Sequence, residues 1–214
     1  MRIGILGSGL MGGKLGTLFA RAGHEVVFAY ARSRSKLTRL AKDAAPNARA
    51  GTPAEAVNGA DALLLAVNWG RIDDVLQQAG DLSGKVLVTC SLAMNEDNTD
   101  LVIAHTSSAA EEIARKARGA RVVSAFGTVP SEVFFGVYDS RKKKARRPTM
   151  IYCGDEDSAK KMVATLIHDA GFDPLDVGPL RIARYTEPFT LLMGQIAYEL
   201  DRGPEVAYRL EWFK

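Results

Sequence analysis

Short apolar runs recur along this 214-residue chain, and segments with the three-to-four-residue spacing of helices separate them. The apolar runs predict strands at residues 3–6, 25–30, 48–51, 60–67, 85–89, 121–126, 149–153 and 173–177. The segments between them predict helices at residues 10–22, 33–44, 71–79, 108–115 and 157–170, with a further short helix beginning at Thr52-Pro53. Residues 181–214 are expected to be mostly helical and to contain no strand.

Strands and helices that alternate along a chain are typical of a parallel sheet with helices on both faces. We therefore expect an α/β fold, with a Rossmann-type doubly wound parallel sheet over residues 1–178. A small C-terminal helical segment follows over residues 179–214. This segment is expected to pack on the ligand side of the sheet or on a second subunit, so a homodimer is one of the two arrangements that we consider.

The first strand leads directly into a glycine-rich turn, Gly7-Ser8-Gly9-Leu10-Met11-Gly12. In this pattern the first glycine turns sharply off the strand, and the second leaves room for a pyrophosphate beside the backbone N–H groups. The third glycine lets the next helix pack closely on the sheet, and the N-terminus of that helix attracts phosphate. Because a strand precedes the turn and a helix follows it, the motif predicts a dinucleotide site.

The end of the second predicted strand indicates which dinucleotide binds. NAD sites usually carry an Asp or Glu there, which bonds the ribose hydroxyls. In this chain no acid occurs between Glu25 and Asp43, and Arg32, Arg34 and Lys36 lie in that stretch. A guanidinium binds a 2′-phosphate that a carboxylate would repel. The pattern predicts NADP(H), and the alternative is the solvated start of a helix, where basic residues are common.

Composition limits the classes of protein to which this chain can belong. It is 47% hydrophobic with a net charge of +3, so it can form a packed core, and nothing in its charge calls for nucleic acid. No apolar run approaches the ~18–20 residues that span a bilayer, and the first residues do not resemble a signal peptide. Cys90 and Cys153 fall in separate apolar segments and are expected as buried free thiols. We expect a cytoplasmic protein that binds a small molecule, with no nucleic-acid or membrane partner.

Ligands of open parallel sheets lie outside the carboxyl ends of the strands. In this chain those ends lead into residues 67–69, 90–93 and 126–130. These segments contain no catalytic triad and no metal-binding cluster, so we assign no catalytic residue and no metal ligand. A conjugated ring stabilises the charge that a hydride brings, whereas a simple ketone needs a proton donor. The sequence therefore favours an oxidoreductase that uses a conjugated ring acceptor.

Several segments together resemble the family of NADPH-dependent reductases of coenzyme F420, a deazaflavin. The resemblance extends over nearly the whole chain and depends on the glycine turn, residues 23–25, 32–36, Trp69, 122–126, 128–130, 153–156, 178–180, 183–184 and 187–188. It implies a Rossmann domain with a small C-terminal segment and NADPH on residues 8–11. It further implies Arg32 and Lys36 at the 2′-phosphate, and a deazaflavin between residues 126–130 and the C-terminal helix.

The motifs and the resemblance together give the site residues that we expect. The expected cofactor-binding residues are Gly7, Ser8, Gly9, Leu10, Met11, Gly12, Tyr30, Ala31, Arg32, Ser33, Lys36, Val67, Asn68, Trp69, Ser91 and Phe126. The expected acceptor-binding residues are Thr128, Val129, Pro130 and Met193. NADP(H) is the expected cofactor, with coenzyme F420 as a co-substrate.

Two other functions stay open at this point. The first is an NADPH-dependent reductase of another small acceptor, such as an imine, a quinone or a hydroxyacid. The second is a non-catalytic NADPH-sensing module, with which the missing catalytic acid is compatible. The basic run at residues 141–147 also has two interpretations, a solvated loop or an electrostatic gate for an anionic acceptor or polyanion.

Overall fold

The structure is a computed structural model that describes residues 1–143 and 146–213. Its strands are β1 (Arg2–Leu6), β2 (Glu25–Ala29), β3 (Ala48–Ala50), β4 (Ala62–Leu65), β5 (Val86–Thr89), β6 (Arg121–Ser124), β7 (Thr149–Gly154) and β8 (Asp173–Asp176). Its α-helices are α1 (Leu10–Arg21), α2 (Arg34–Asp43), α3 (Pro53–Val57), α4 (Ile72–Ala79), α5 (Ala109–Lys116), α6 (Val133–Ser140), α7 (Asp157–Asp169) and α8 (Ala183–Tyr198). Two 3-10 turns, η1 (Trp69–Arg71) and η2 (Leu180–Ile182), precede α4 and α8.

All the strands belong to one sheet, in the order β3-β2-β1-β4-β5-β6-β7-β8. Strands β1 to β6 are parallel, and the order reverses between β1 and β4, which is the doubly wound arrangement. The predicted α/β Rossmann-type fold is therefore confirmed. The expectation of a wholly parallel sheet is wrong at β7, which runs antiparallel to β6. The last two residues of β7 pair with the last two residues of β6, so β7 begins beyond the carboxyl edge of the sheet and ends beside β6.

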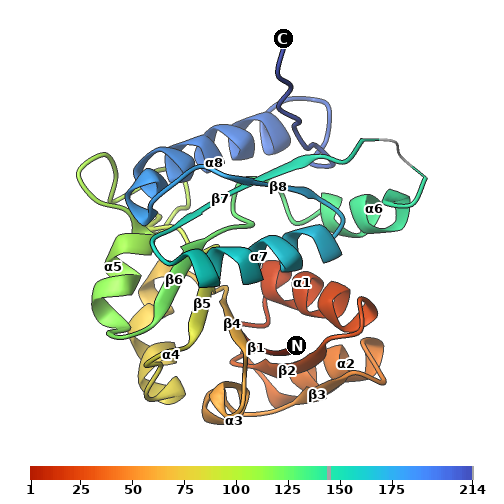
Figure 1. The fold of residues 1–214 in the computed structure, drawn as a ribbon, viewed down its shortest axis with the longest axis vertical. Helices are drawn as coiled ribbons and strands as arrows, with labels where there is room; N and C mark the ends of the chain where they lie inside the picture. Colours follow the sequence, from red (N-terminus) through yellow and green to blue (C-terminus); the bar gives the residue numbers. More distant parts are fainter. Residues whose placement is uncertain (144–145, 214) are drawn as a thin grey trace.

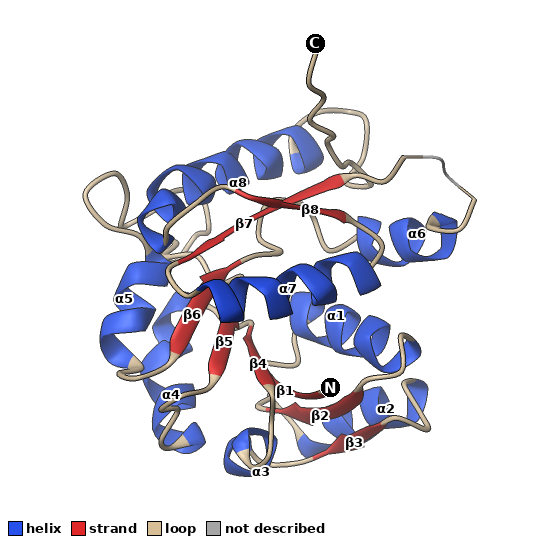
Figure 2. Ribbon diagram, viewed as in Figure 1, coloured by secondary structure: helices blue, strands red, loops and turns tan. Residues whose placement is uncertain are grey.

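Helices cover both faces of the sheet because strand residues alternate between two cores. Ile3, Ile5 and Leu64 face a core that α1, α2, α6 and α7 complete. Leu63 and Leu65 face a second core that α3, α4 and α5 complete. Figure 2 shows β7 and β8 running across the direction of β4, β5 and β6, with α8 on the side away from α1.

The C-terminal segment differs from its prediction. Helix α8 ends at Tyr198, and the structure contains no helix or strand between residues 199 and 213. Gly203, at a φ of 78°, and Pro204 lie five and six residues beyond the end of α8 and disfavour a helix in the residues around them. Figure 1 shows α8 at the end of the molecule opposite α2 and α3, with the C-terminal chain beside it. Nothing tests the division of the chain at residue 178, which stays a prediction.

Helix α6 was not predicted, although its buried residues Val133, Phe134, Val137 and Tyr138 have helical spacing. The residues that the structure describes include no helix long and apolar enough to cross a membrane.

Candidate functional site

The glycine turn brings the start of α1 against the ends of β1 and β4. Gly7 has a φ of 114°, and a Cβ there would lie 2.3 Å from the Ala66 carbonyl oxygen. A Cβ on Gly12 would lie 1.9 Å from the Gly7 carbonyl oxygen, so only glycine permits this approach of helix and turn. Gly16 has the same role in the next turn of the helix, because its Cβ would lie 2.4 Å from the Phe28 ring. The close packing predicted for this helix face is present.

Gly9 differs from these glycines because the space beside it is open. A Cβ at Gly9 would meet no atom within 4 Å. Gly9 precedes the first residue of α1, and no side chain caps that helix. By contrast, Ser33, Thr52 and Ser108 cap α2, α3 and α5 through their hydroxyl oxygens. The first N–H groups of α1, on Leu10, Met11 and Gly12, therefore lack a side-chain acceptor and adjoin an open space, which fits a pyrophosphate.

Ser8 contributes differently from its neighbours. Its side chain is buried, and its hydroxyl donates to the Ala29 carbonyl at 2.9 Å, while its backbone N–H bonds the Tyr30 carbonyl. Both bonds fasten the turn to β2, so the Ser8 side chain points away from the open space at Gly9.

The basic segment after β2 lies at the surface beside this turn. Arg32 and Arg34 are exposed, Lys36 and Ala31 are half-buried, and none of the three cations has an ion pair within the described residues. The Ser33 hydroxyl accepts from the Lys36 backbone N–H and contacts Ser35, so it caps α2. The cations are therefore available for an anion at the start of α2.

Tyr30 separates the glycine turn from the basic segment. It has a φ of 57°, and its hydroxyl donates to the Asp74 carboxylate on α4. Burial and this bond raise the pKa of the phenol to about 12, and the same bond lowers the pKa of Asp74. The Asp74 carboxylate is thus bonded to the first residue after β2.

The segments after β4 and β5 meet at the carboxyl edge. The Ser91 hydroxyl accepts from the Val67 backbone N–H at 3.2 Å and contacts the Leu65 carbonyl at 3.4 Å. Val67 is half-buried, Asn68 is exposed, and Trp69 is half-buried at the start of η1. The structure therefore brings these predicted residues to one edge, with Ser91 joining the two strand ends.

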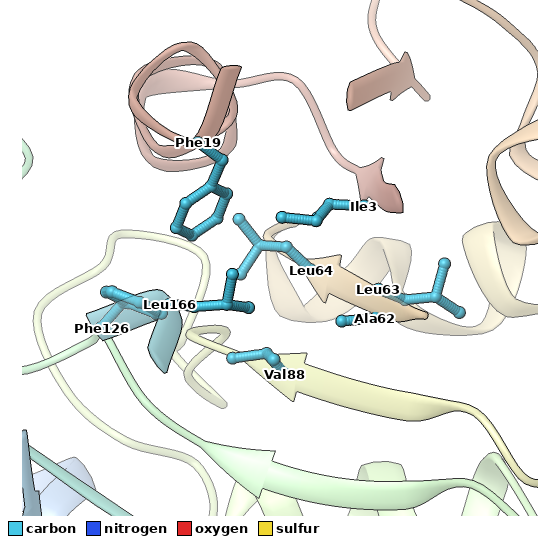
Figure 3. Close-up of a pocket in the computed structure, with 8 residues that line it drawn as sticks. All are labelled: Ile3, Phe19, Ala62, Leu63, Leu64, Val88, Phe126 and Leu166. Atoms are coloured by element: carbon cyan, nitrogen blue, oxygen red, sulfur yellow. The ribbon is translucent and has the colours of Figure 1, made fainter. Parts of the chain in front are cut away.

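Phe126 lies elsewhere. Its side chain is fully buried and packs edge-on against Phe19, with ring centroids 5.9 Å apart. Figure 3 shows the ring of Phe126 among Phe19, Leu64, Val88 and Leu166, inside the apolar core. The Phe126 side chain is therefore part of the core, and the expected contact of this residue with the cofactor stays a prediction. A φ of 67° turns the backbone at this residue, so that Phe126 faces the core while Gly127 and Thr128 face α8.

Between the ends of β5 and β6 and helix α8 lies a small polar cavity of about 10 Å³. Its walls are Cys90, Ser91, Leu92, Ser124, Ala125, Gly127, Thr128, Ile151, Thr186, Glu187 and Thr190. Thr128 is the predicted acceptor residue that lines it. Val129 is buried in the core, and Pro130 and Met193 are buried outside the cavity wall. Burial raises the pKa of the Cys90 thiol to about 12, so this sulfur is a protonated thiol at neutral pH.

Glu187 is the main residue of this region that sequence reasoning did not assign a role. It is 3% exposed, and its carboxylate accepts from the backbone N–H groups of Ala109 at 2.8 Å and Ala110 at 3.0 Å. Beside it, Arg184 donates two bonds to Glu111, at 2.9 and 2.7 Å. Burial raises the pKa of Glu187 to about 7, although both N–H bonds oppose that shift. These contacts fix α8 to the first turn of α5 and so hold α8 over the cavity.

The sequence carries only a faint signal for this role. A glutamate in a helical segment is ordinary, and its partners lie 77 and 78 residues away along the chain. Among the described residues, no group of three or more His, Cys, Asp or Glu side chains is placed to hold a metal ion.

Comparisons with known proteins show which family and which folds this chain resembles. Residues 2–93 match the family described as NADP oxidoreductase, coenzyme F420-dependent, which confirms the resemblance inferred from the sequence over the segment with the glycine turn and the basic stretch. The metalloreductase STEAP3 of Rattus norvegicus is 28% identical over 190 residues, which are 89% of this chain and 36% of that protein. The chain therefore spans about a third of the length of this curated relative.

Two solved structures share the fold. A protein of Arthrobacter sp. FB24, proposed to be an F420-dependent NADP reductase, is 22% identical with a TM-score of 0.85, covering 99% of this chain and 100% of that one. An imine reductase of Myxococcus stipitatus, solved with NADP+, is 20% identical with a TM-score of 0.66, covering 91% of this chain and 61% of that one. The family and these proteins are named as oxidoreductases or reductases.

Proposed function

We propose, with the family match of residues 2–93 as the premise, that the protein is an NADP(H)-dependent oxidoreductase. We propose further that it passes a hydride between NADPH and a conjugated ring acceptor, of which the deazaflavin coenzyme F420 is one. The observation that carries the first proposal is the uncapped start of α1 beside the open space at Gly9. A pyrophosphate fits there, because the N–H groups of the helix point to it and no side chain fills the space.

The choice of NADP(H) over NAD(H) depends on the basic segment after β2. Arg32 and Lys36 would hold the 2′-phosphate, because both are accessible and neither has an ion pair within the described residues. The carboxylate of Asp74, which lies on α4 near this surface, accepts the Tyr30 hydroxyl.

The chain's own residues would then place the nicotinamide end near Val67, Asn68, Trp69 and Ser91, at the carboxyl edge of β4 and β5. Bound NADPH supplies the hydride. The acceptor would lie between this edge, the loop at residues 126–130 and α8, where the water-sized cavity and the buried surroundings exclude bulk water. Holding two rings in contact lowers the entropic component of the barrier, and this is the main catalytic contribution that we assign to the protein.

A cofactor titration and an acceptor panel test this proposal. Purified protein is titrated with NADPH and with NADH, and NADPH oxidation is then followed at the nicotinamide absorbance with coenzyme F420, a cyclic imine and a quinone. We expect tighter binding of NADPH than of NADH, and turnover with coenzyme F420. Tight NADPH binding with no turnover of any acceptor would instead favour a sensing module.

The second candidate is reduction of a smaller acceptor, an imine in particular. The fold shared with the imine reductase of Myxococcus stipitatus supports it. Turnover with the cyclic imine and none with coenzyme F420 would favour this candidate. A cytoplasmic location, a small-molecule partner without nucleic acid or membrane, and a homodimer remain proposals.

A further inference from the structure

The C-terminal chain returns to the site after α8 ends. The Thr149 backbone N–H donates to the Tyr208 carbonyl at 2.9 Å, and the Leu210 N–H donates to the Thr149 hydroxyl at 3.1 Å. Glu211 forms an ion pair with Arg146 at 2.6 Å. These bonds fasten residues 208–211 to the start of β7. The other end of β7 is the part that pairs with β6.

Tyr208 inserts its ring between α8 and the loop after β6. The ring packs edge-on against Phe189 of α8, with centroids 5.1 Å apart, and its hydroxyl lies 2.8 Å from the Thr128 hydroxyl. Burial raises the pKa of this phenol. A residue of the C-terminal chain thus touches the predicted acceptor residue that lines the cavity.

The hydrogens of this cluster can be counted. The Thr128 hydroxyl has one hydrogen, and in the structure it donates to the Met150 sulfur at 3.7 Å. Tyr208 is then the donor in its bond with Thr128. A thioether is a weak acceptor, so the Thr128 hydrogen is held weakly, while the bond from Tyr208 polarises the hydroxyl and makes it a better donor.

The cavity beside Thr128 has the volume of one water, about 10 Å³, and so admits an oxygen or nitrogen atom but not a ring. Two other hydroxyls of its wall are already committed, because Ser91 contacts the Leu65 carbonyl and Thr190 donates to the Thr186 carbonyl. Among the hydroxyls of the described wall, that of Thr128 is the one that bonds a buried phenol, so its hydrogen is the one that Tyr208 would make a stronger donor toward an acceptor atom in this space.

We propose that the Thr128 hydroxyl donates a hydrogen bond to a carbonyl oxygen or imine nitrogen of the acceptor, and that Tyr208 is the positioning residue that orients and polarises this hydroxyl. The inference rests on the proposed function and narrows its substrate to rings that carry such an atom in conjugation with the carbon that receives the hydride. The hydride forms a C–H bond at that carbon, the π electrons move to the oxygen or nitrogen, and a proton from water completes the reduction. Thr128 stabilises the charge that develops in between.

Four variants test the inference. Thr128→Val removes the donor, Thr128→Ser keeps it, and Tyr208→Phe keeps the ring but removes the polarising hydroxyl. Tyr198→Phe is the matched control, since Tyr198 lies at the exposed end of α8 and its hydroxyl donates to Glu132 at 3.0 Å. We expect kcat to fall about 100-fold in Thr128→Val and about 10-fold in Tyr208→Phe. Thr128→Ser and Tyr198→Phe should stay within about threefold of the wild type, and NADPH affinity should be unchanged in all four variants.

A binding experiment separates this inference from the proposed function. The complex with NADP+, which has no hydride to give, is titrated with anthraquinone-2-sulfonate by calorimetry. We expect Thr128→Val and Tyr208→Phe to weaken quinone binding about 10-fold and the other two variants to bind like the wild type. Equal binding by all five proteins, or no binding by the wild type, overturns the inference. The expected binding pattern without turnover of any acceptor overturns the proposed function and leaves the inference standing.

Discussion

The two ends of this sheet depend on different kinds of contact. At the nucleotide end, β1, β2 and the start of α1 expose backbone N–H groups, glycines and surface cations, and the residues that act together lie within about thirty positions of one another. At the end where we propose that the acceptor binds, called the acceptor end below, α8 and the C-terminal chain bring side chains onto partners 73 to 80 positions away, among them Glu187 on α5 and Tyr208 on Thr128. Close packing of the backbone determines the structure of the first end, and polar contacts between distant segments determine the structure of the second.

The largest effect expected from this contrast is at Gly12, where backbone packing is tightest. Gly12→Ala places a Cβ 1.9 Å from the Gly7 carbonyl oxygen, and because neither backbone can yield, we expect the free energy of unfolding to fall by about 3 kcal/mol. Urea denaturation of the variant and the wild type measures the change.

Gly9→Val is the substitution to compare with Gly12→Ala, because the new side chain enters open space and not a packed contact. We expect its unfolding free energy to stay within about 0.5 kcal/mol of the wild type while NADPH affinity falls at least about 100-fold. If Gly9→Val unfolds as readily as Gly12→Ala, the open space at Gly9 is not a ligand site.

Arg32 tests the cations at the same end. We expect Arg32→Ala to weaken NADPH binding by about 1.5–3 kcal/mol, or roughly 10- to 150-fold, while NADH binding stays nearly constant. The reason is that only NADPH carries the 2′-phosphate that the guanidinium would bind. Calorimetric titrations with both nucleotides measure the difference, and an equal loss for both would contradict the assignment.

Glu187 tests the acceptor end through pH. Its folded-state pKa of about 7 lies above its ordinary value of 4.5, so the folded protein binds this proton more tightly than the unfolded chain. The contribution of Glu187 to the free energy of unfolding therefore increases as pH falls through 7 and is lost as pH rises through 7. Between pH 8 and pH 5.5 we expect the wild type to gain about 2 kcal/mol relative to Glu187→Gln, from a shift of this size.

Urea denaturation of both proteins at several pH values measures this difference. A difference that does not vary with pH would show that the Glu187 carboxyl ionises in the folded protein as it does in water.

The smallest effect is expected from the basic run at residues 141–147, of which positions 144 and 145 lie outside the described residues. Arg146 pairs with Glu211, and Arg147 donates to the His168 carbonyl at 3.3 Å; both are surface contacts. Changing Lys142, Lys143, Arg146 and Arg147 to serine should cost at most about 1 kcal/mol of stability. We expect kinetics and their salt dependence to stay unchanged, and a lost salt dependence would favour the electrostatic gate.

What the sequence predicts well is local. The turn from Gly7 to Gly12 follows a strand and opens a helix, so its geometry is readable from six consecutive residues. The alternation of strands and helices likewise predicted the doubly wound sheet and all of its strands. Phe126 escaped prediction because its backbone adopts a left-handed conformation, which turns the side chain into the core and which an aromatic residue does not signal.

The acceptor end escaped prediction for another reason. The antiparallel entry of β7, the docking of Glu187 on α5 and the insertion of Tyr208 depend on where distant segments meet in space. A tyrosine in a segment without periodicity gives no sign of its partner, and Thr128 stood out only through the family resemblance.

The return of the C-terminal chain to β7 should also hinder the pairing of β7 with a strand of another molecule. The start of β7 at Thr149 is a strand edge, and residues 208–210 cover it through the bonds of Tyr208 and Leu210 with Thr149. A protease that removed the chain from residue 207 onward would bare this edge and leave it free to recruit the strands of another molecule. Trimmed protein should therefore polymerise on storage, and an intact C-terminus is the form to preserve during purification.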